Sequence, residues 1–333
     1  MPTKLAKHKN STRSKSPVRE SKGKSEEIIT FPKAEPPVAI GRHLGIRDDK
    51  TNFIGVPEVA ANIGCKVFQI FTGSPRCING NNKLEIEFQK FGMKLEEFKR
   101  IMVIHSNYMI NLCHPVGSRR YSESVDALIK DLKASEHIGS RCLGVVVHMG
   151  KNILSNNLTD NDAMDNYIEG IEECLRRTKN GILIMETGAS QGSEIASNTE
   201  GMSEIYWRVP EEQRDRIKFC IDTCHIWASG YDISTKAGVK QYFSEFDDQI
   251  SISQIACIHF NDSKNKCGSH VDRHADLGYG MIPVEGLRAV ARFAAKHQIP
   301  LIMETHLAAI NPKTKRKVSY RDELNTVLKW ISD

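Results

Sequence analysis

The chain has 333 residues, of which 40% are hydrophobic and 26% are charged, as is typical of a globular protein with one large core. No apolar run approaches the roughly 20 residues that a membrane-spanning helix needs, and the polar amino-terminal stretch lacks the pattern of a secretory signal. The composition therefore argues against a membrane-embedded or secreted protein, and we expect an intracellular protein with no membrane partner.

Positive charge is concentrated in residues 1–36. They hold nine Lys or Arg side chains against four Asp or Glu, which accounts for the whole formal charge of +5. The other 297 residues hold 37 side chains of each sign, so any basic surface on the folded part must come from local clustering. Residues 1–36 are also rich in Lys, Ser and Pro. We expect a disordered tail that serves as a solvated leader, a targeting segment or a tether.

Eight apolar runs follow at intervals of roughly 30–45 residues, the length of a strand, a helix and their loops. In chain order they cover residues 38–46, 67–72, 101–105, 143–148, 182–186, 217–222, 255–260 and 300–304. Several are nearly continuous β-branched segments, which are typical of parallel strands buried on both faces.

The segments between these runs have the spacing of amphipathic helices. The apolar repeat in residues 125–132 ends before Gly139, and the repeat in residues 324–331 follows a Ser-Tyr-Arg-Asp capping box. Eight alternating units predict that residues 37–333 form a (β/α)8 TIM barrel as a single domain. A doubly wound open sheet is the alternative, although a barrel gathers strand-end side chains more naturally at one mouth.

Six of the apolar runs end in a carboxylate or an imidazole, which core packing does not explain. The side chains at these ends and in the adjoining loops are His105, His148, Glu186, Asp222, His225, His259, Asp272, His274 and Glu304. One strand-end carboxylate alone is more often a helix cap, and one buried histidine alone is more often a hydrogen-bonded core residue. Nine such residues at a single mouth instead indicate a cluster of divalent metal ions that activates water.

Chain position divides these candidate ligands into three sets. The sets are His105, His148 and Glu186; Glu186, Asp222, His259 and Glu304; and His225, Asp272 and His274. The first is a His/His/Glu set of the kind found at zinc sites. Glu186 belongs to two sets because a carboxylate has two oxygens and can bridge two ions.

The nine cysteines are odd in number and contain no CxxC pair, and several lie inside apolar runs. We expect reduced, mostly buried thiols. Cysteine ligands to zinc are the less favoured alternative, because thiolate sites usually show closely spaced pairs.

Loops after the strands carry side chains suited to contacting a nucleic acid. Arg76 follows the second strand, and Tyr108 and Met109 follow a candidate ligand. The last two could be ordinary lid residues or could wedge into a base stack. Lys264 and Arg273 would then contact phosphates.

The motifs HSNYMINLCHP, ETGASQGSEI, CIDTCHIWASGYD, HFNDSK, DRHADLGYG and METH stand in the order found in the endonuclease IV family of apurinic/apyrimidinic endonucleases. The chain resembles that family over about residues 38–333. The resemblance implies a barrel with three metal ions per chain, usually Zn²⁺, in which Mn²⁺ can replace one. By motif, the nine candidates match the family's ligands in the same three sets. Arg76, Tyr108 and Met109 match positions that penetrate the duplex and help to flip the abasic nucleotide.

The resemblance further implies an enzyme of base excision repair. It would hydrolyse the phosphodiester 5′ to an abasic site in double-stranded DNA, leave a 3′-hydroxyl and a 5′-deoxyribose phosphate, and clean blocked 3′ ends. We expect Glu186 and Glu304 to be catalytic, with Glu304 orienting or deprotonating the attacking water. We also expect a monomer, located in the nucleus or another compartment that contains DNA.

Two other interpretations remain at this point. A xylose isomerase-like sugar isomerase would use the set Glu186, Asp222, His259 and Glu304, but it has no need for the other five candidate ligands. A non-enzymatic DNA-binding barrel is the third interpretation. An intact ligand set opposes it, because buried carboxylates and histidines are costly to keep without a metal.

Overall fold

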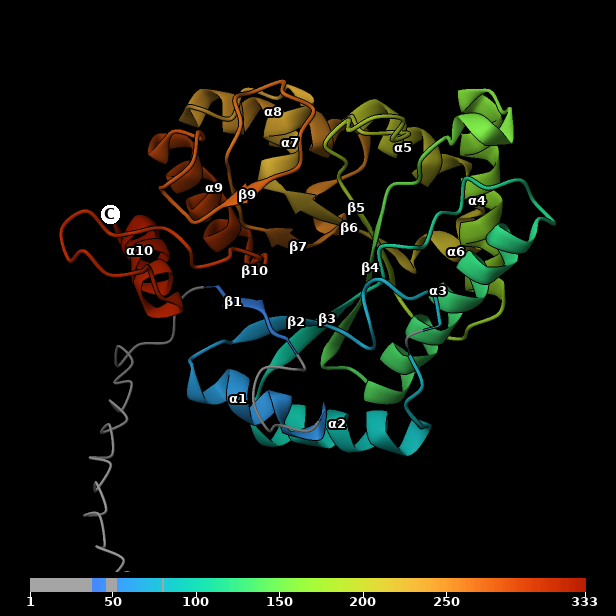
Figure 1. Cartoon of the computed structure of the whole chain (residues 1–333), viewed down its shortest axis with the longest axis horizontal. Coiled ribbons are helices and arrows are strands. Elements are labelled where there is room, and N and C mark those ends of the chain that lie inside the picture. Colours follow the sequence, from blue (N-terminus) through green and yellow to red (C-terminus); the bar gives the residue numbers. More distant parts are fainter. Residues whose placement is uncertain (1–37, 46–52, 80) are drawn as a thin grey trace, which may run out of the picture. The chain divides into compact units, whose positions relative to one another are not determined.

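The computed structural model describes residues 38–45, 53–79 and 81–333, so the predicted tail, residues 1–36, and its boundary with the barrel lie outside the described part. Eight parallel strands close into a barrel in the order β1-β10-β7-β6-β5-β4-β3-β2, and β1 pairs with β2 to complete the circle (Figure 1). The predicted (β/α)8 barrel is confirmed, and the open sheet is excluded.

Each predicted apolar run coincides with one barrel strand. The strands are β1 (Ile40–His43), β2 (Val67–Phe71), β3 (Ile101–His105), β4 (Cys142–His148), β5 (Leu183–Glu186), β6 (Ile217–Asp222), β7 (Ile255–His259) and β10 (Leu301–Met303). The largest difference is at the first run, 38–46, where pairing with β2 ends at His43. A separate two-stranded antiparallel ribbon joins β8 (Asp262–Ser263) to β9 (His274–Ala275).

Helices surround the strands, as Figure 1 shows. They are α1 (Val56–Asn62), α2 (Glu85–Glu97), α3 (Arg119–Ile138), α4 (Asp160–Arg176), α5 (Thr199–Arg208), α6 (Glu211–Arg214), α7 (Thr223–Ser229), α8 (Lys236–Gln249), α9 (Val284–His297) and α10 (Tyr320–Ser332), with 3₁₀ turns at Phe53–Gly55, Leu154–Asn156 and Ile252–Gln254. None of the helices in the described part of the chain combines the length and hydropathy needed to cross a bilayer.

The helix signals in the sequence are confirmed. The apolar repeat of α3 is buried, and the helix ends at Gly139, whose φ of 92° suits a residue without a Cβ. At the start of α10, the Ser319 side chain accepts from the backbone N–H of Asp322, and the Asp322 carboxylate accepts from the N–H of Ser319.

The barrel interior contains an apolar ring beneath a polar ring. The apolar ring consists of seven buried side chains, Val67, Val103, Val146, Ile184, Cys220, Cys257 and Ile302. Successive side chains of a strand point to opposite faces, so the residue two positions later faces the same interior, nearer the carboxyl end. Those residues are Gln69, His105, His148, Glu186, Asp222, His259 and Glu304. Strand geometry therefore delivers six of the nine candidate ligands to one level of the mouth.

Candidate metal centre

The structure brings the candidate ligands together in overlapping groups that could hold metal ions. Within each group the ligand atoms lie within 4.8 Å of one another, and the groups are His105, His148 and Glu186; Glu186, Asp222, His259 and Glu304; and Asp222, His225 and His274. The first two groups are identical to two of the sets expected from the sequence. Asp272, the remaining candidate, forms a further group of this kind with His274 and Cys224, a residue that the sequence did not single out.

Glu186 is the centre of the cluster. Its Oε2 lies 3.1 Å from His148 Nε2 and 3.4 Å from His105 Nε2, whereas its Oε1 lies 2.7 Å from His259 Nδ1. One carboxylate oxygen therefore faces the first group and the other faces the second, as a bridging ligand requires. Burial alone would raise the pKa of Glu186, but His259 and His148 outweigh it and hold that pKa well below its usual value.

The third group forms where β6 turns into α7. Asp222 Oδ1 caps the helix by accepting from the N–H groups of Cys224 and His225 at 2.7 and 3.0 Å, and its Oδ2 lies 3.4 Å from His274 Nε2. Asp272 Oδ1 lies 3.3 Å from His225 Nε2 and 3.2 Å from His274 Nε2. The expected set of His225, Asp272 and His274 is thus assembled, and Asp222 adjoins it, which the sequence did not indicate.

Hydrogen bonds orient three of the histidines. The Nδ1–H of His105 donates to the carbonyl of Ser106 at 2.7 Å, and the Nδ1–H of His225 donates to the carbonyl of Thr187 at 2.7 Å. The Nε2–H of His259 donates to Gln69 Oε1 at 2.8 Å. Each ring thereby keeps its other nitrogen free to face the carboxylates, an arrangement common among metal-binding histidines.

Four carboxylates in this small volume raise the pKa values of His148, His225, His259 and His274. Burial alone would lower the pKa of His274, but Asp222 and Asp272 outweigh burial and raise that pKa to about 9. The pKa values of His225 and His259 are likewise held well above the ordinary value. Cations are therefore needed to balance the cluster, and divalent metal ions can replace the protons.

Three buried atoms of the candidate ligands lack a hydrogen-bond partner in the described part of the chain. They are Glu186 Oε2, His225 Nε2 and His274 Nε2. Such atoms are costly unless something binds them. Carboxylate oxygens and imidazole nitrogens are the donors preferred by zinc and acceptable to manganese, so the residues present fit these ions.

Glu304 is held at the edge of the cluster by two amides. Gln69 Nε2 donates to Glu304 Oε1 at 2.7 Å, and Asn261 Nδ2 donates to Glu304 Oε2 at 3.2 Å and to Asp222 Oδ2 at 2.7 Å. Burial alone would raise the pKa of Glu304, but His259 and His274 outweigh it and lower the pKa to about 2. Neither amide was predicted from the sequence, although a glutamine inside the apolar run VFQIF was a usable signal.

His43 is a further residue at the mouth that the sequence analysis did not single out. Its Nδ1 lies 3.1 Å from Gln69 Nε2, and its ring lies 4.7 Å from that of Phe71. Burial, reinforced by the nearby His105 and His259, lowers the pKa of His43 to about 4, so this imidazole is neutral at physiological pH.

A cavity of about 1330 Å³ opens above the candidate ligands and is lined in part by Tyr108 and Met109. Both side chains are more than half exposed, at 52% and 56%. The backbone N–H of Tyr108 donates to the carbonyl of Pro75 at 2.9 Å, which joins its loop to the loop of Arg76. Three residues proposed for DNA contact therefore lie on adjoining loops at the mouth.

The other two proposed DNA contacts adjoin the β8–β9 ribbon, Lys264 directly after β8 and Arg273 directly before β9. Lys264 and Arg273 are both exposed, and the N–H of Lys264 donates to the carbonyl of Arg273 at 2.9 Å. Asp262 anchors the loop that follows the ribbon by accepting from the N–H groups of Gly278, Gly280 and Ile282. Neither Lys264 nor Arg273 lines the cavity, so any phosphate they contact must lie outside it.

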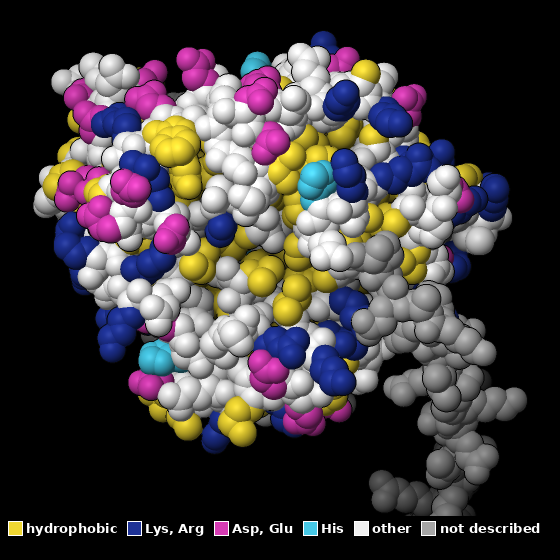
Figure 2. All heavy atoms as spheres, turned by 180° about the vertical axis from the view of Figure 1, so that it is seen from behind, with side chains coloured by type: hydrophobic (Ala, Val, Ile, Leu, Met, Phe, Trp, Pro, Cys, Tyr) yellow, Lys and Arg dark blue, Asp and Glu magenta, His cyan; other side chains and the backbone are white. Residues whose placement is uncertain are grey.

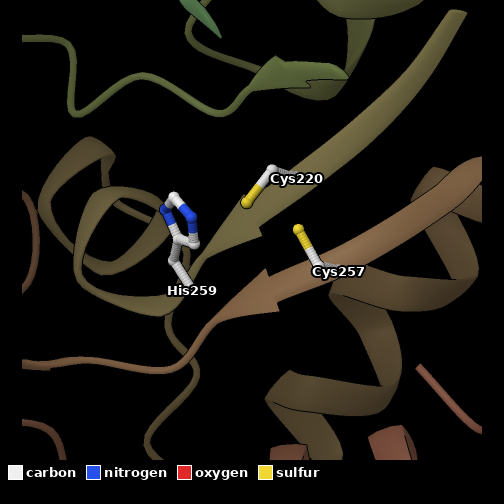
Figure 3. Close-up of side chains that lie close together, drawn as sticks. All are labelled: Cys220, Cys257 and His259. Atoms are coloured by element: carbon white, nitrogen blue, oxygen red, sulfur yellow. The ribbon is translucent and has the colours of Figure 1, made fainter. Parts of the chain in front are cut away.

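Two thiols lie directly beneath the polar ring. Cys220 and Cys257 are paired residues of β6 and β7, both are fully buried, and they form a third type of potential ligand group with His259. In Figure 3 their sulfur atoms point toward each other, and His259 approaches from the end of β7. They occupy positions that the other strands fill with Val or Ile, so we interpret them as core residues. All nine cysteines are free thiols in the structure, and six are buried.

Comparison with known proteins identifies the family. The sequence model of the family described as "xylose isomerase-like TIM barrel" matches residues 57–329. Over 293 residues the chain is 52% identical to an Acanthamoeba polyphaga mimivirus protein that carries an endonuclease 4 name, covering 88% of this chain and 93% of the viral one. The chain belongs to the endonuclease IV family.

Solved structures agree with membership of the endonuclease IV family. Endonuclease IV from Thermus thermophilus is 26% identical with a TM-score of 0.72, covering 88% of this chain and 99% of that chain. A D-tagatose 3-epimerase-like protein also matches, with a TM-score of 0.63, 13% identity and coverage of 89% of this chain and 98% of that chain. That second likeness concerns the fold alone, so endonuclease IV proteins share their barrel with enzymes of other chemistry.

Proposed function

We propose that this chain is a zinc-dependent apurinic/apyrimidinic endonuclease. It hydrolyses the phosphodiester 5′ to an abasic site in double-stranded DNA, leaving a 3′-hydroxyl and a 5′-deoxyribose phosphate, and it also removes blocking groups from 3′ ends. It works as a monomer with three Zn²⁺ ions, one of which Mn²⁺ can replace. The place of action is a compartment that contains DNA, such as the nucleus.

One observation carries this proposal: all nine candidate ligands lie at one mouth, in groups that share Glu186 and Asp222. A sugar isomerase of the same barrel class would use Glu186, Asp222, His259 and Glu304 and leave five costly residues without a task. The full set instead suits a phosphodiester, which gains negative charge as water attacks it, so that several cations around it are useful.

The three sets divide the work at the mouth. His105, His148 and Glu186 would hold the first ion; Glu186, Asp222, His259 and Glu304 the second; and His225, Asp272 and His274 the third. Divalent ions bound there would lower the pKa of water, shield the phosphate charge and stabilise the leaving oxygen.

Glu304 is the carboxylate best placed to handle the proton of the attacking water. It lines the cavity, and its two oxygens are held by the amides of Gln69 and Asn261. A base that is fixed in this way loses little entropy in reaching the water. Glu186 lies within 4 Å of four imidazoles and offers one oxygen to each of two sets, so its role would be to fix the spacing of the metal ions.

Side chains at the rim of the cavity would select the abasic nucleotide. Tyr108 and Met109 are exposed apolar side chains that could enter the base stack, and Arg76 lies on the adjoining loop. An abasic nucleotide costs least to flip, because it has no base pair and no stacked base to lose. Lys264 and Arg273 would hold backbone phosphates beside the flipped nucleotide.

The proposal is tested by incubating the protein with a duplex that contains one tetrahydrofuran lesion, with and without a chelator. We expect one incision on the 5′ side of the lesion, a product with a 3′-hydroxyl, and loss of incision with the chelator. Incision on the 3′ side, or full activity in the chelator, would overturn it. Conversion of a ketose or aldose sugar without DNA incision would support the isomerase instead.

A further inference from the structure

A basic hairpin leaves the barrel directly after the proposed catalytic strand end. Glu304, Thr305 and His306 line the cavity, and the chain then forms a hairpin over residues 307–318, closed by an antiparallel bridge between Ile310 and Lys317. Residues 313–317 read Lys-Thr-Lys-Arg-Lys, with four basic side chains and no acidic one. Because residues 37–333 have no net charge overall, this run is a local excess of the kind that binds an anion.

The hairpin is held in place at its base. Asp276, which is buried, accepts from the N–H of Leu307 at 2.8 Å and from the N–H of Ala309 at 2.6 Å. The N–H of Val318 donates to the carbonyl of Ala309 at 2.9 Å. Asp276 follows the candidate ligand His274 by two residues, so the hairpin is fastened to the segment that carries two of the three residues of the third ligand set.

The tip of the hairpin is ordered by Asn311. Its side-chain oxygen accepts from the N–H of Lys313 at 2.9 Å and of Thr314 at 3.1 Å, and its own N–H donates to the carbonyl of Arg316. The lysines therefore project from a defined turn. A defined turn loses less entropy on binding than a free loop would.

Three of the four charges are available to a partner. Arg316 pairs with Asp322 at 2.9 Å, whereas Lys313, Lys315 and Lys317 are exposed and form no ion pair with a residue of the described chain. On the face shown in Figure 2, acidic side chains are frequent on the left and sparse on the right, where Lys and Arg prevail. Because Figure 2 views the molecule from behind, its right-hand side corresponds to the left of Figure 1, where α9 and α10 lie.

We propose that the hairpin of residues 307–318 is a clamp for the phosphate backbone of duplex DNA, at phosphates beyond the lesion. This inference rests on the proposed function and extends its DNA footprint. A duplex that delivers an abasic nucleotide to the cavity must cross the rim, and the hairpin starts one residue after the cavity lining ends. Lysine is a strongly hydrated point charge, which suits phosphates without regard to base sequence.

The test compares the full chain with its K313A/K315A/K317A variant on an undamaged duplex that extends a full turn beyond the rim on both sides. Affinity is measured over a series of KCl concentrations. Each phosphate contact that is lost lowers the slope of log affinity against log salt by about one, so we expect a fall of about two to three and at least about tenfold weaker binding at low salt. A K313Q/K315Q/K317Q variant, which keeps polar side chains only slightly shorter than lysine, should behave alike.

The matched control is K133A/K179A/K240A, which removes three exposed lysines from α3, the loop before β5 and α8. This control should keep the salt slope of the parent. Residues 1–36 are present in every variant, so any contribution they make to DNA binding is the same in all of them. An unchanged slope and affinity in both hairpin variants would overturn the clamp, even if the parent incises a tetrahydrofuran duplex. If the parent fails to incise that duplex but the slope falls as expected, the proposed function fails and the clamp survives as a DNA-binding site.

Discussion

Gln69 on β2 and Glu304 at the end of β10 meet over β1, which lies between these two strands, although 235 positions separate the residues in the chain: the Gln69 amide donates to the Glu304 carboxylate at 2.7 Å. The carbonyl oxygen of the same amide accepts from His259 at 2.8 Å. One neutral side chain on β2 therefore fixes the orientation of the carboxylate proposed as general base and of a candidate metal ligand. Residues that orient ligands in this way commonly matter nearly as much as the ligands themselves.

Replacing Gln69 by Leu should lower incision of abasic duplex by about 10–100-fold, because Glu304 and His259 would both lose an orienting partner. Circular dichroism should show a folded barrel, since Leu fits the apolar run of β2. The control is Gln89→Leu, an exposed position on α2 that should leave the rate unchanged. A Gln69→Leu enzyme with the parent rate would show that the amide has no positioning role.

Replacing Glu304 by Gln should slow incision by about 10²–10⁴-fold, the range expected when a general base is lost. The variant keeps the size of the side chain, so most of the metal and the affinity for abasic duplex should remain. Single-turnover kinetics, a binding assay and metal analysis on one preparation check the three expectations. Incision at the parent rate would remove Glu304 from its assigned role.

Replacing Tyr108 by Ala should weaken binding of abasic duplex by about 1–3 kcal/mol, the usual contribution of an aromatic ring that stacks on a base. The Tyr108 ring lies 5.6 Å from that of His148 and 5.2 Å from that of Phe71, so it is already held in place for insertion. Metal content should not change, and Tyr108→Phe should bind like the parent. Equal affinity of the Ala variant for abasic duplex would contradict the wedge.

The sequence was sufficient to predict the barrel and the convergence of the nine candidate ligands at one mouth, because both depend on local periodicity. Strands that end in His, Glu or Asp must present them at one mouth once the sheet closes, and DTCH places Asp222 and His225 on one helical turn. The orienting amides could not be derived in that way. The contact of Gln69 with Glu304, or of Asn261 with Asp222, depends on which strands lie beside each other in the closed barrel and on how their side chains are aligned. The basic hairpin was not predicted because its sequence has no apolar periodicity. It lies between a strand and a helix whose periodicity is clear.

Asp131 predicts a pH dependence of stability that is independent of the mouth. This carboxyl is buried on α3 and accepts from Thr72 Oγ1 at 2.6 Å and from Asn81 Nδ2 at 3.3 Å, and burial raises its pKa to about 6. The folded chain keeps this proton up to about pH 6, whereas the unfolded chain loses it near pH 4. The free energy of unfolding therefore falls by about 3 kcal/mol as the pH rises through this window.

The measurement for Asp131 is denaturant unfolding of the parent and of Asp131→Asn at pH 4 and pH 7. Since Asn carries no charge at either pH, the variant should equal the parent at pH 4 and exceed its stability by up to about 3 kcal/mol at pH 7. If the free energy of unfolding differed between variant and parent by the same amount at both pH values, the Asp131 carboxyl would not titrate between pH 4 and pH 7.

The most direct measurement of the central claim is the metal content of the purified, nuclease-active chain. We predict about three zinc or manganese ions per chain, because nine residues form three adjoining sets at one mouth. The count should stay the same in C220V/C257V, whose thiols lie in the apolar ring below. A content of one or two ions in fully active protein would contradict the account.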